Sequence, residues 1–381
     1  MKIQKICIIG DGLAGLSTAI TLCKENVKID LYANKTNKNN IKIDNRTTAV
    51  SESSYQFMLE KLNIKKNIFW PNKEINLYFE DGKKNKKFLN FKEKSKNFMY
   101  IFQNKKLKKN LLEKISKQKN IKFIKKNITK IDHENSLILI NKNKFFYDLI
   151  ILCIGSHSRL YNKITQNRAI KNDYKEVALT ATVKHRSNII NVSQFFLKEG
   201  PLAILPFSKN ELSVVWSIDN QFFNQKNKSL KSLLQSKIKI LLDKIKIKNI
   251  ENIQSFPIYL NLKSKYFKKN TLILGDGLHS VHPMAGQGFN LVLRDIKKLS
   301  EMISNVLKIG LLFKNTFLLK NFYEARKPEN TILGLGIHLT NIFFKKNKYF
   351  FPIKKKILSN IGDVRFIKKL SQLISDKGVS I

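Results

Sequence analysis

The segment Lys5-Ile6-Cys7-Ile8-Ile9-Gly10-Asp11-Gly12-Leu13-Ala14-Gly15 decides the fold class of this chain of 381 residues. Residues 5–9 form a short apolar strand, residues 16–24 read as a helix and residues 27–32 as a second strand. The first glycine of the turn permits a tight bend, the second lets the backbone approach a pyrophosphate, and the third lets helix pack on strand. We therefore predict an α/β protein that begins with a Rossmann-like dinucleotide-binding unit.

The second strand lacks the acidic residue that normally binds the ribose hydroxyls of a dinucleotide, because Ala33 stands at that position. Asp30 and Asp44 are close enough in sequence to be substitutes. Asp30 alternates with apolar neighbours, so it should face the other side of the strand. We expect the adenosine to be bound more weakly or in a different arrangement.

A second glycine loop, Gly275-Asp276-Gly277-Leu278-His279-Ser280-Val281-His282-Pro283-Met284-Ala285-Gly286-Gln287-Gly288-Phe289-Asn290, lies between an apolar run and an apolar-periodic segment. The loop should therefore join a strand, residues 271–274, to a helix, residues 291–306. Amides at a helix start have no partner within the helix and attract negative charge. Gly286 and Gly288 carry no side chain that would hold a flat ligand away from those amides.

Composition indicates a folded, reducing-compartment protein. Apolar residues make up 43% of the chain and aromatic residues 10%. The three cysteines, Cys7, Cys23 and Cys153, fall in apolar stretches and suit reduced core positions. We find no signal peptide and no apolar run long enough to span a bilayer, so we expect a cytoplasmic protein.

The formal net charge of +43 raises the question of a nucleic-acid partner. The excess is mainly lysine, is spread along the whole chain and accompanies no recognition helix, zinc-ligand spacing or RNA-binding motif. We therefore expect no nucleic acid. Attraction to the anionic inner face of a membrane stays open, since each lysine near such a surface contributes roughly 1 kcal/mol.

Runs of strands interrupt the α/β pattern and predict an inserted sheet domain. We expect a hairpin at residues 75–79 and 87–91, helices at 107–116 and 229–247, and strands at 121–131, 136–140, 145–153, 176–185, 189–197, 202–207 and 212–218. The predicted nucleotide-binding domain comprises residues 1–74, 96–175 and 266–330, and the predicted substrate domain comprises residues 75–95 and 176–265. Residues 331–381 form a helical C-terminal region, whose basic and aromatic residues either lie in a membrane interface or close the core of the two domains.

Four motifs occur in an order that resembles a known family. They are Gly10 to Gly15, Arg46-Thr47-Thr48-Ala49, Gly200-Pro201-Leu202-Ala203-Ile204-Leu205-Pro206 and Gly275 to Asn290. With them, the chain resembles the flavin-dependent aromatic hydroxylases of ubiquinone biosynthesis, members of the larger p-hydroxybenzoate hydroxylase-like group, over nearly its whole length. The resemblance implies an FAD-binding domain, a mainly-β substrate domain and a flavin ring at their junction.

The resemblance also implies roles for individual residues. The expected cofactor-binding residues are Gly10, Gly12, Leu13, Ala14 and Gly15 at the FAD pyrophosphate, Arg46 near the adenosine, Asp276 at the ribityl chain, and Gly286, Gln287, Gly288, Phe289 and Asn290 beside the flavin ring. Pro283 should lie over the ring edge, and Pro283, Gly286 and Gln287 are the expected catalytic positions. No metal is implied. His279 and His282 read as residues that order the loop and not as catalysts.

The implied reaction is hydroxylation of the aromatic ring of a prenylated phenol. NAD(P)H reduces FAD, and O2 forms a flavin C4a-hydroperoxide that transfers one oxygen to the ring. Residues 202–207 and 212–218, with Phe195, Phe196 and Trp216, either wall the substrate pocket or form ordinary sheet core. Other ubiquinone-biosynthesis proteins and a membrane surface are possible partners.

Three departures from the family pattern leave an alternative open. Besides Ala33, Ile154-Gly155 stands where the family has Asp-Gly, and Lys108 stands where an arginine is usual. The chain could instead be a non-catalytic subunit of a quinone-biosynthesis assembly that binds FAD poorly. A yellow purified protein whose colour NAD(P)H bleaches would distinguish the enzyme from the scaffold.

Overall fold

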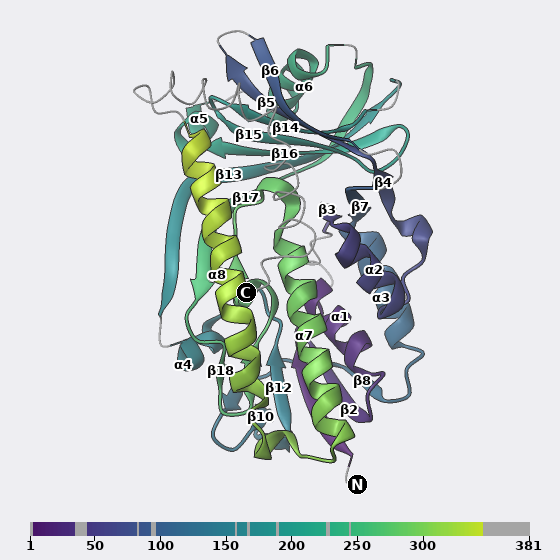
Figure 1. Cartoon of the computed structure of the whole chain (residues 1–381), viewed down its shortest axis with the longest axis vertical. Helices are drawn as coiled ribbons and strands as arrows, with labels where there is room; N and C mark the ends of the chain where they lie inside the picture. The colour runs from purple at the N-terminus through teal and green to yellow at the C-terminus, as the bar shows by residue number, and fades with distance from the viewer. Residues whose placement is uncertain are drawn as a thin grey trace.

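The computed structural model describes residues 3–34, 44–81, 84–92, 97–156, 158–165, 168–187, 190–225, 229–243 and 245–345. Two large sheets stand at opposite ends of the molecule, and the long helices α7 (Gly288–Lys308) and α8 (Leu318–Phe344) extend from the lower one to the upper one (Figure 1). The predicted aromatic and basic segment beyond Lys345 lies outside the described residues. Within the described ranges, no helix is both long enough and apolar enough to cross a bilayer.

The first sheet is built around the predicted βαβ unit. Its strands are, in spatial order, β18 (Phe267–Lys268), β19 (Thr271–Ile273), β12 (Leu149–Leu152), β1 (Gln4–Ile9), β2 (Val27–Ala33) and β8 (Ile121–Lys125). All neighbours pair in parallel except β18 with β19. Helix α1 (Leu13–Leu22) joins β1 to β2 and contacts α3 (Asn104–Ile115) and α7. Strands of a parallel sheet are covered on both faces, which explains why β1 and β12 are buried along almost their whole length.

The second sheet is the inserted one. Its strands are, in spatial order, β20 (His279–Ser280), β17 (Ile247–Lys263), β13 (Ala169–His185), β16 (Glu211–Asp219), β15 (Gly200–Pro206), β14 (Val192–Leu197), β5 (Glu74–Asp81) and β6 (Lys84–Lys92). The predicted hairpin is present as β5 and β6, although Gly82 of its turn lies outside the described residues. Helices α5 (Asn220–Gln225) and α6 (Leu230–Leu241) pack on this sheet, and α7 points at it from the opposite side (Figure 1).

Two small sheets complete the fold. One consists of β3 (Thr47–Val50), β7 (Met99–Gln103) and β4 (Trp70–Asn72), and the other of β9 (Lys130–Asp132), β10 (Leu137–Ile140) and β11 (Asn143–Phe146). The remaining helices are α2 (Glu52–Glu60) and the short α4 (Asn162–Thr165). Because β3 and α2 both contact α7, they bring residues near Ser51 to the second glycine loop.

Several predicted elements differ from the structure. The helix expected at residues 229–247 ends at Leu241, and the strand β17, which the sequence did not suggest, begins at Ile247. Pro257 within β17 argues against a strand, yet it sits where the pairing with β13 shifts register between Asp173 and Val177. The strands expected at 121–131 and 145–153 are each broken into two, and β13 begins at Ala169 instead of residue 176.

Candidate active site

One large cavity of about 1830 Å³ lies between the first sheet and the second sheet. The starts of α1 and α7 border it on one side, and one face of the second sheet borders it on the other. Most of the predicted site residues line it: Gly12, Leu13, Ala14, Arg46, Asp276, Pro283, Gly286, Gln287, Gly288, Phe289 and Asn290. Residues from three motifs far apart in the sequence therefore meet in a single space.

Gly10 and Gly15 are not among the lining residues, and the structure gives them a different position. Gly10 has φ +115°, and a Cβ added to it would lie 2.2 Å from the carbonyl oxygen of Cys153. A Cβ on Gly15 would lie 1.9 Å from the carbonyl oxygen of Gly10. The two glycines allow β1, α1 and β12 to approach closely, and Gly12, with open space where its Cβ would be, is the one that borders the cavity.

The second glycine loop is a series of short turns that ends in a helix. After β19 the chain forms a 3-10 turn (Gly275–Gly277), the short strand β20, a second 3-10 turn (Met284–Gly286) and then α7. Gly286 has φ +63°, and a Cβ there would lie 3.0 Å from the Cβ of Ala49. At Gly288 the nearest atom to such a Cβ is 4.0 Å away. Neither α1 nor α7 has a side-chain hydrogen bond at its N-cap, so the first amides of both helices are available to a ligand in the cavity.

Asn290 holds this loop against β3. Its side-chain oxygen accepts a hydrogen bond of 3.0 Å from the Ser51 amide, and its Nδ2 donates to the Gly286 carbonyl oxygen at 3.2 Å. The side chain is almost fully buried. Asn290 therefore fixes the shape of the turn in this structure.

Arg46 and Asp44 form a charged pair at the wall of the cavity. The guanidinium Nε and Nη2 each lie 2.8 Å from an Asp44 carboxylate oxygen, and Asn104 Nδ2 donates to the same carboxylate at 3.0 Å. Burial acts to raise the pKa of Asp44, but the hydrogen bonds and charge of Arg46 outweigh it and lower the pKa. Asp44 thus presents a carboxylate to the cavity, and it is the better placed of the two predicted substitutes for the missing ribose acid.

Asp30 points elsewhere, as the alternation of β2 suggested. Its carboxylate accepts a hydrogen bond of 2.8 Å from the Tyr147 hydroxyl and pairs with Lys5 at 2.8 Å. Lys108, the residue that stands where an arginine is usual, pairs with Asp11 at 3.0 Å beside the first glycine loop. Ile154 and Gly155 follow β12, and Gly155 lines the cavity.

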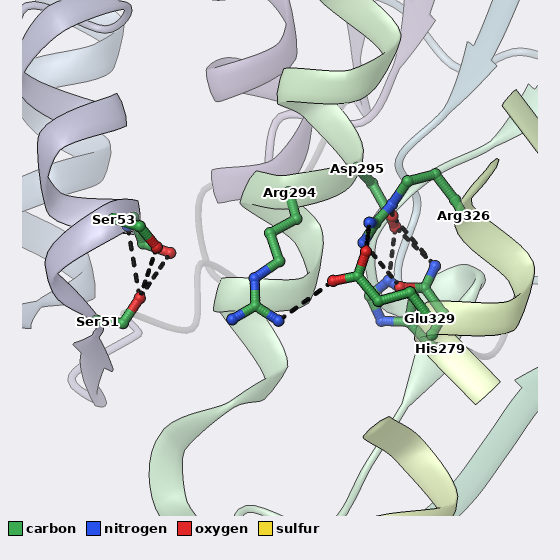
Figure 2. Close-up of polar contacts among 9 residues, drawn as sticks. Ser51, Ser53, His279, Arg294, Asp295, Arg326 and Glu329 are labelled. Carbon is green, nitrogen blue, oxygen red and sulfur yellow. Dashed lines mark hydrogen bonds and ion pairs between the residues drawn. The ribbon is translucent and has the colours of Figure 1, made fainter. Parts of the chain in front are cut away.

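A buried charge network connects the second glycine loop to α7 and α8. Figure 2 shows His279, Asp295 and Arg326 gathered together, with Arg294 reaching toward Glu329. His279 Nε2 lies 2.7 Å from Asp295 Oδ2, and Arg326 Nε lies 2.6 Å from Asp295 Oδ1. Burial acts to raise the pKa of Asp295, but Arg326 and His279 hold it below its usual value. The network joins the loop to α7 and α8, so His279 has the ordering position that the sequence suggested.

His282 belongs to a second buried cluster. Its Nε2 lies 2.8 Å from Glu176 Oε2 on β13, and its Nδ1 accepts a hydrogen bond of 3.2 Å from the Met284 amide. The other Glu176 oxygen pairs with Lys345 at 2.7 Å, at the end of α8. Burial acts to raise the pKa of Glu176, but hydrogen bonds from His282 and Lys345 outweigh it and lower the pKa.

The sequence reasoning missed Glu176, Asp295 and Arg326. A signal existed for Asp295, because a charge within the apolar face of α7 needs a buried partner. Nothing local marks Glu176 or Arg326, since each meets its partner only in the folded chain.

The sheet side of the cavity is mostly apolar. Lining residues alternate along the strands with residues of the core on the opposite face, as the pleat requires. The lining set on this face includes Ala178, Thr180, Gln194, Phe196, Ala203, Leu205, Ser213 and Val215. Phe196 is confirmed as a wall residue, whereas Phe195 and Trp216 belong to the core on the opposite face beneath α6. Of the two alternatives left open for these aromatic residues, the cavity wall thus holds for Phe196 and the sheet core for Phe195 and Trp216.

The end of α8 closes one side of this apolar part. Phe344 stacks on Phe196 with ring centroids 3.5 Å apart, and Leu339 and Phe343 also line the cavity. For these described residues the packing agrees with one of the two alternatives stated from the sequence, in which C-terminal aromatic side chains close the core. Leu339 and Ile342 nevertheless keep 62% and 51% of their surface exposed.

The residues present fit FAD. A dinucleotide needs donors for its pyrophosphate, and the α1 start at Gly12 supplies open space and unpaired amides. A flat ring needs a surface without side chains, and Gly288 supplies one beside the start of α7. The cavity also connects the starts of α1 and α7 to the second sheet, because residues of all three line it.

Comparison with known proteins places the chain in a class. Residues 4–215 match the family model described as pyridine nucleotide-disulphide oxidoreductase, and residues 146–363 match the model described as squalene epoxidase. Each model covers more than half of the chain. The chain is thus an FAD-dependent oxidoreductase of the monooxygenase class.

Relatives and solved structures agree with this class. The chain is 27% identical to the ubiquinone biosynthesis monooxygenase COQ6 of Dictyostelium discoideum, over 74% of this chain and 68% of that protein. It is 28% identical to the 3-demethoxyubiquinol 3-hydroxylase of Escherichia coli, over 40% of each chain. The p-nitrophenol 4-monooxygenase PnpA of Pseudomonas putida shares the fold with a TM-score of 0.77 at 13% identity, covering 100% of this chain and 99% of that chain. The first two relatives are named as a monooxygenase and a hydroxylase of ubiquinone biosynthesis, the kind of protein that the motifs of this chain resemble.

Proposed function

We propose that this protein hydroxylates the aromatic ring of a prenylated phenol in ubiquinone biosynthesis, with FAD as cofactor, NAD(P)H as electron donor and O2 as oxygen source. One observation carries the proposal: a single cavity joins the starts of α1 and α7 to an apolar face of the second sheet. A hydroxylase needs this arrangement because cofactor and substrate must meet away from water. The names of the relatives supply the substrate class.

Bound FAD would supply the redox and oxygen-transfer chemistry, and the chain would bind, orient and shield. The α1 amides near Gly12 would receive the pyrophosphate, Arg46 would lie on the adenosine side, and Asp276 would accept a hydrogen bond from the ribityl chain. The α7 amides at Gly288 and Phe289 would face negative charge on the reduced ring, a stabilisation of roughly 0.3 to 2 kcal/mol. Pro283 would pack over the ring edge.

The sheet face would receive the phenol. Ala203 and Val215 are small enough to leave room for a ring, while Phe196 and Leu205 contribute apolar surface that excludes water. Thr180, Gln194 and Ser213 are polar side chains on the same face and can orient a ring hydroxyl. Since His279 and His282 each bind a buried carboxylate, both act on the loop in this proposal and neither serves as the base.

A peripheral position at the inner face of a membrane, together with other ubiquinone-biosynthesis proteins, is part of the same proposal. The formal net charge of +43 favours an anionic surface, and a prenyl tail partitions into a bilayer. Vesicle flotation with anionic and with zwitterionic lipids would measure it. Equal binding to both would remove the electrostatic argument.

The test of the function is the missing product. Lipid extracts from cells that lack this protein should accumulate a prenylated phenol short of one hydroxyl group, and the purified enzyme with NAD(P)H should convert that compound and incorporate oxygen from 18O2. Normal ubiquinone levels in such cells, with no accumulated precursor, would refute the proposed substrate.

A further inference from the structure

Glu176 connects three parts of the molecule that border the cavity. It lies on β13 of the second sheet, and its carboxylate binds His282 of the second glycine loop and Lys345 at the end of α8. Its side chain is only 3% exposed and that of His282 is 0% exposed. Removal of either partner of a buried carboxylate is strongly destabilising, because the charge that remains buried is then not fully compensated.

The contacts of His282 determine its tautomer. A backbone amide can only donate, so the hydrogen bond from the Met284 amide requires an unprotonated Nδ1. The ring proton is then on Nε2 and points at the Glu176 carboxylate, 2.8 Å away. Glu176 therefore selects the form of His282 that can bind the Met284 amide.

Met284 begins the 3-10 turn (Met284–Gly286) that leads into α7. The direction of the first α7 amides depends on the path of this turn. The Tyr174 and His282 rings form a T-shaped pair at a centroid distance of 5.1 Å, so the imidazole is confined from a second side.

We propose that Glu176 is a positioning residue of the flavin site. Through its contact with His282 it holds the Met284–Gly286 turn in place, and through its ion pair with Lys345 the position of that turn depends on the end of α8. The inference rests on the proposed function, since it gives the turn its role beside the flavin. Glu176 touches neither cofactor nor substrate in this account. Phe344, at the end of α8, stacks on Phe196 in the apolar part of the cavity. A substrate bound there would therefore affect the glycine loop that faces the flavin ring.

The direct test is hydrogen–deuterium exchange at the Met284 amide in the full chain without FAD. In Glu176→Ala the imidazole loses its acceptor, so the Met284 amide should exchange at least about tenfold faster, as expected for a buried group that loses its partner. Glu176→Gln keeps an acceptor for Nε2 and should restore slow exchange. Glu251→Gln is the control, because Glu251 forms an exposed ion pair with Lys184 on the same strand β13, with 2.9 Å between charged atoms.

Two further variants keep the inference testable if Glu176→Ala does not fold. Lys345→Met alters a side chain that is 45% exposed, and it should accelerate Met284 exchange by at least about threefold. His282→Asn keeps an acceptor near the Nδ1 position but does not reach Glu176. His282→Gln reaches Glu176 but has no acceptor near the Nδ1 position. Only His282→Gln should therefore lose the exchange protection of the Met284 amide fully. Exchange within twofold of the wild-type rate in both Lys345→Met and His282→Gln would overturn the inference.

FAD binding is the second readout. Glu176→Ala should weaken FAD binding about tenfold and shift the flavin absorption band, and Glu176→Gln should recover both. A wild-type chain that binds no FAD would refute the proposed function, while the exchange experiment would still decide on Glu176. Normal FAD binding in Glu176→Ala, with fast Met284 exchange, would show that the turn does not control the ring and would overturn the inference.

Discussion

Replacement of Gly288 by alanine separates folding from cofactor binding more cleanly than other changes in the cavity. A Cβ at Gly288 has no neighbour closer than 4.0 Å, and Gly288 is the first residue of α7. The folded chain should therefore accept Gly288→Ala without strain. Alanine also loses less conformational freedom on folding than glycine, so the free energy of unfolding should stay constant or rise by up to about 1 kcal/mol.

The same methyl group should interfere with a bound ring. It would stand between the ring and the α7 amides, whose interaction with negative charge amounts to about 0.3 to 2 kcal/mol. At about 1.4 kcal/mol per tenfold change in affinity, the dissociation constant of FAD should rise about 2- to 30-fold. Gly288→Val, which is larger, should weaken binding further.

The assay is fluorescence titration of the FAD-free protein with FAD, together with urea unfolding of each variant. Gly336→Ala is a matched control, because Gly336 in α8 also has no atom within 4 Å of an added Cβ and does not line the cavity. It should leave the FAD dissociation constant unchanged. Wild-type FAD affinity in both Gly288→Ala and Gly288→Val would refute the placement of the ring beside α7.

Four further variants test the charge network, the adenosine side and the substrate side of the cavity. Arg326→Met should lower the free energy of unfolding by about 3 to 5 kcal/mol, because Asp295 is then a buried carboxylate without its main partner; urea unfolding measures it, and a loss below about 1 kcal/mol would contradict the network's role. Since the folded pKa of Asp295 is lowered, its stabilisation is fully present above the unfolded pKa of about 3.9 and is lost as pH falls through the folded pKa. In Asp295→Asn, the free energy of unfolding should fall less as the pH is lowered. If it falls as steeply as in the wild type, other carboxylates control the acid dependence. Arg46→Met should raise the FAD dissociation constant about tenfold with only a modest loss of stability, because its ion pair with Asp44 is partly exposed. Unchanged affinity in the same titration would remove Arg46 from the adenosine side. Ala203→Phe should raise the KM for the phenol at least about tenfold by filling the sheet side of the cavity, with unchanged FAD affinity, and steady-state kinetics showing a normal KM would move the substrate elsewhere.

Local patterns in the sequence were sufficient for the parts of the fold that depend on local chemistry. The first glycine turn, the second glycine loop and the hairpin β5–β6 each occur where the residue pattern predicted them, because turn glycines and alternating apolar residues act within a few positions. The strand β17 was missed because its first half repeats apolar residues at every third position and its second half contains Pro257. Only its long pairing with β13 makes that segment a strand.

The site shows the same division. Glycines and the helix starts that follow them are visible in sequence, whereas the partners of His279 and His282 come from segments 16 and 106 residues away. The side of the sheet to which Phe195 and Trp216 point depends on strand register, which the run of aromatic residues does not fix. Ion pairs such as Glu176 with Lys345 depend on where α8 ends, and the last residue of α8, Phe344, stacks on Phe196 of the second sheet.

The most direct test of the central claim is whether the purified chain holds a reducible flavin in this cavity. The purified protein should be yellow, bind FAD stoichiometrically and be bleached by NADH or NADPH without oxygen, and Gly288→Val should lose FAD while staying folded. A colourless chain with normal secondary structure that cannot be reconstituted with FAD would contradict it.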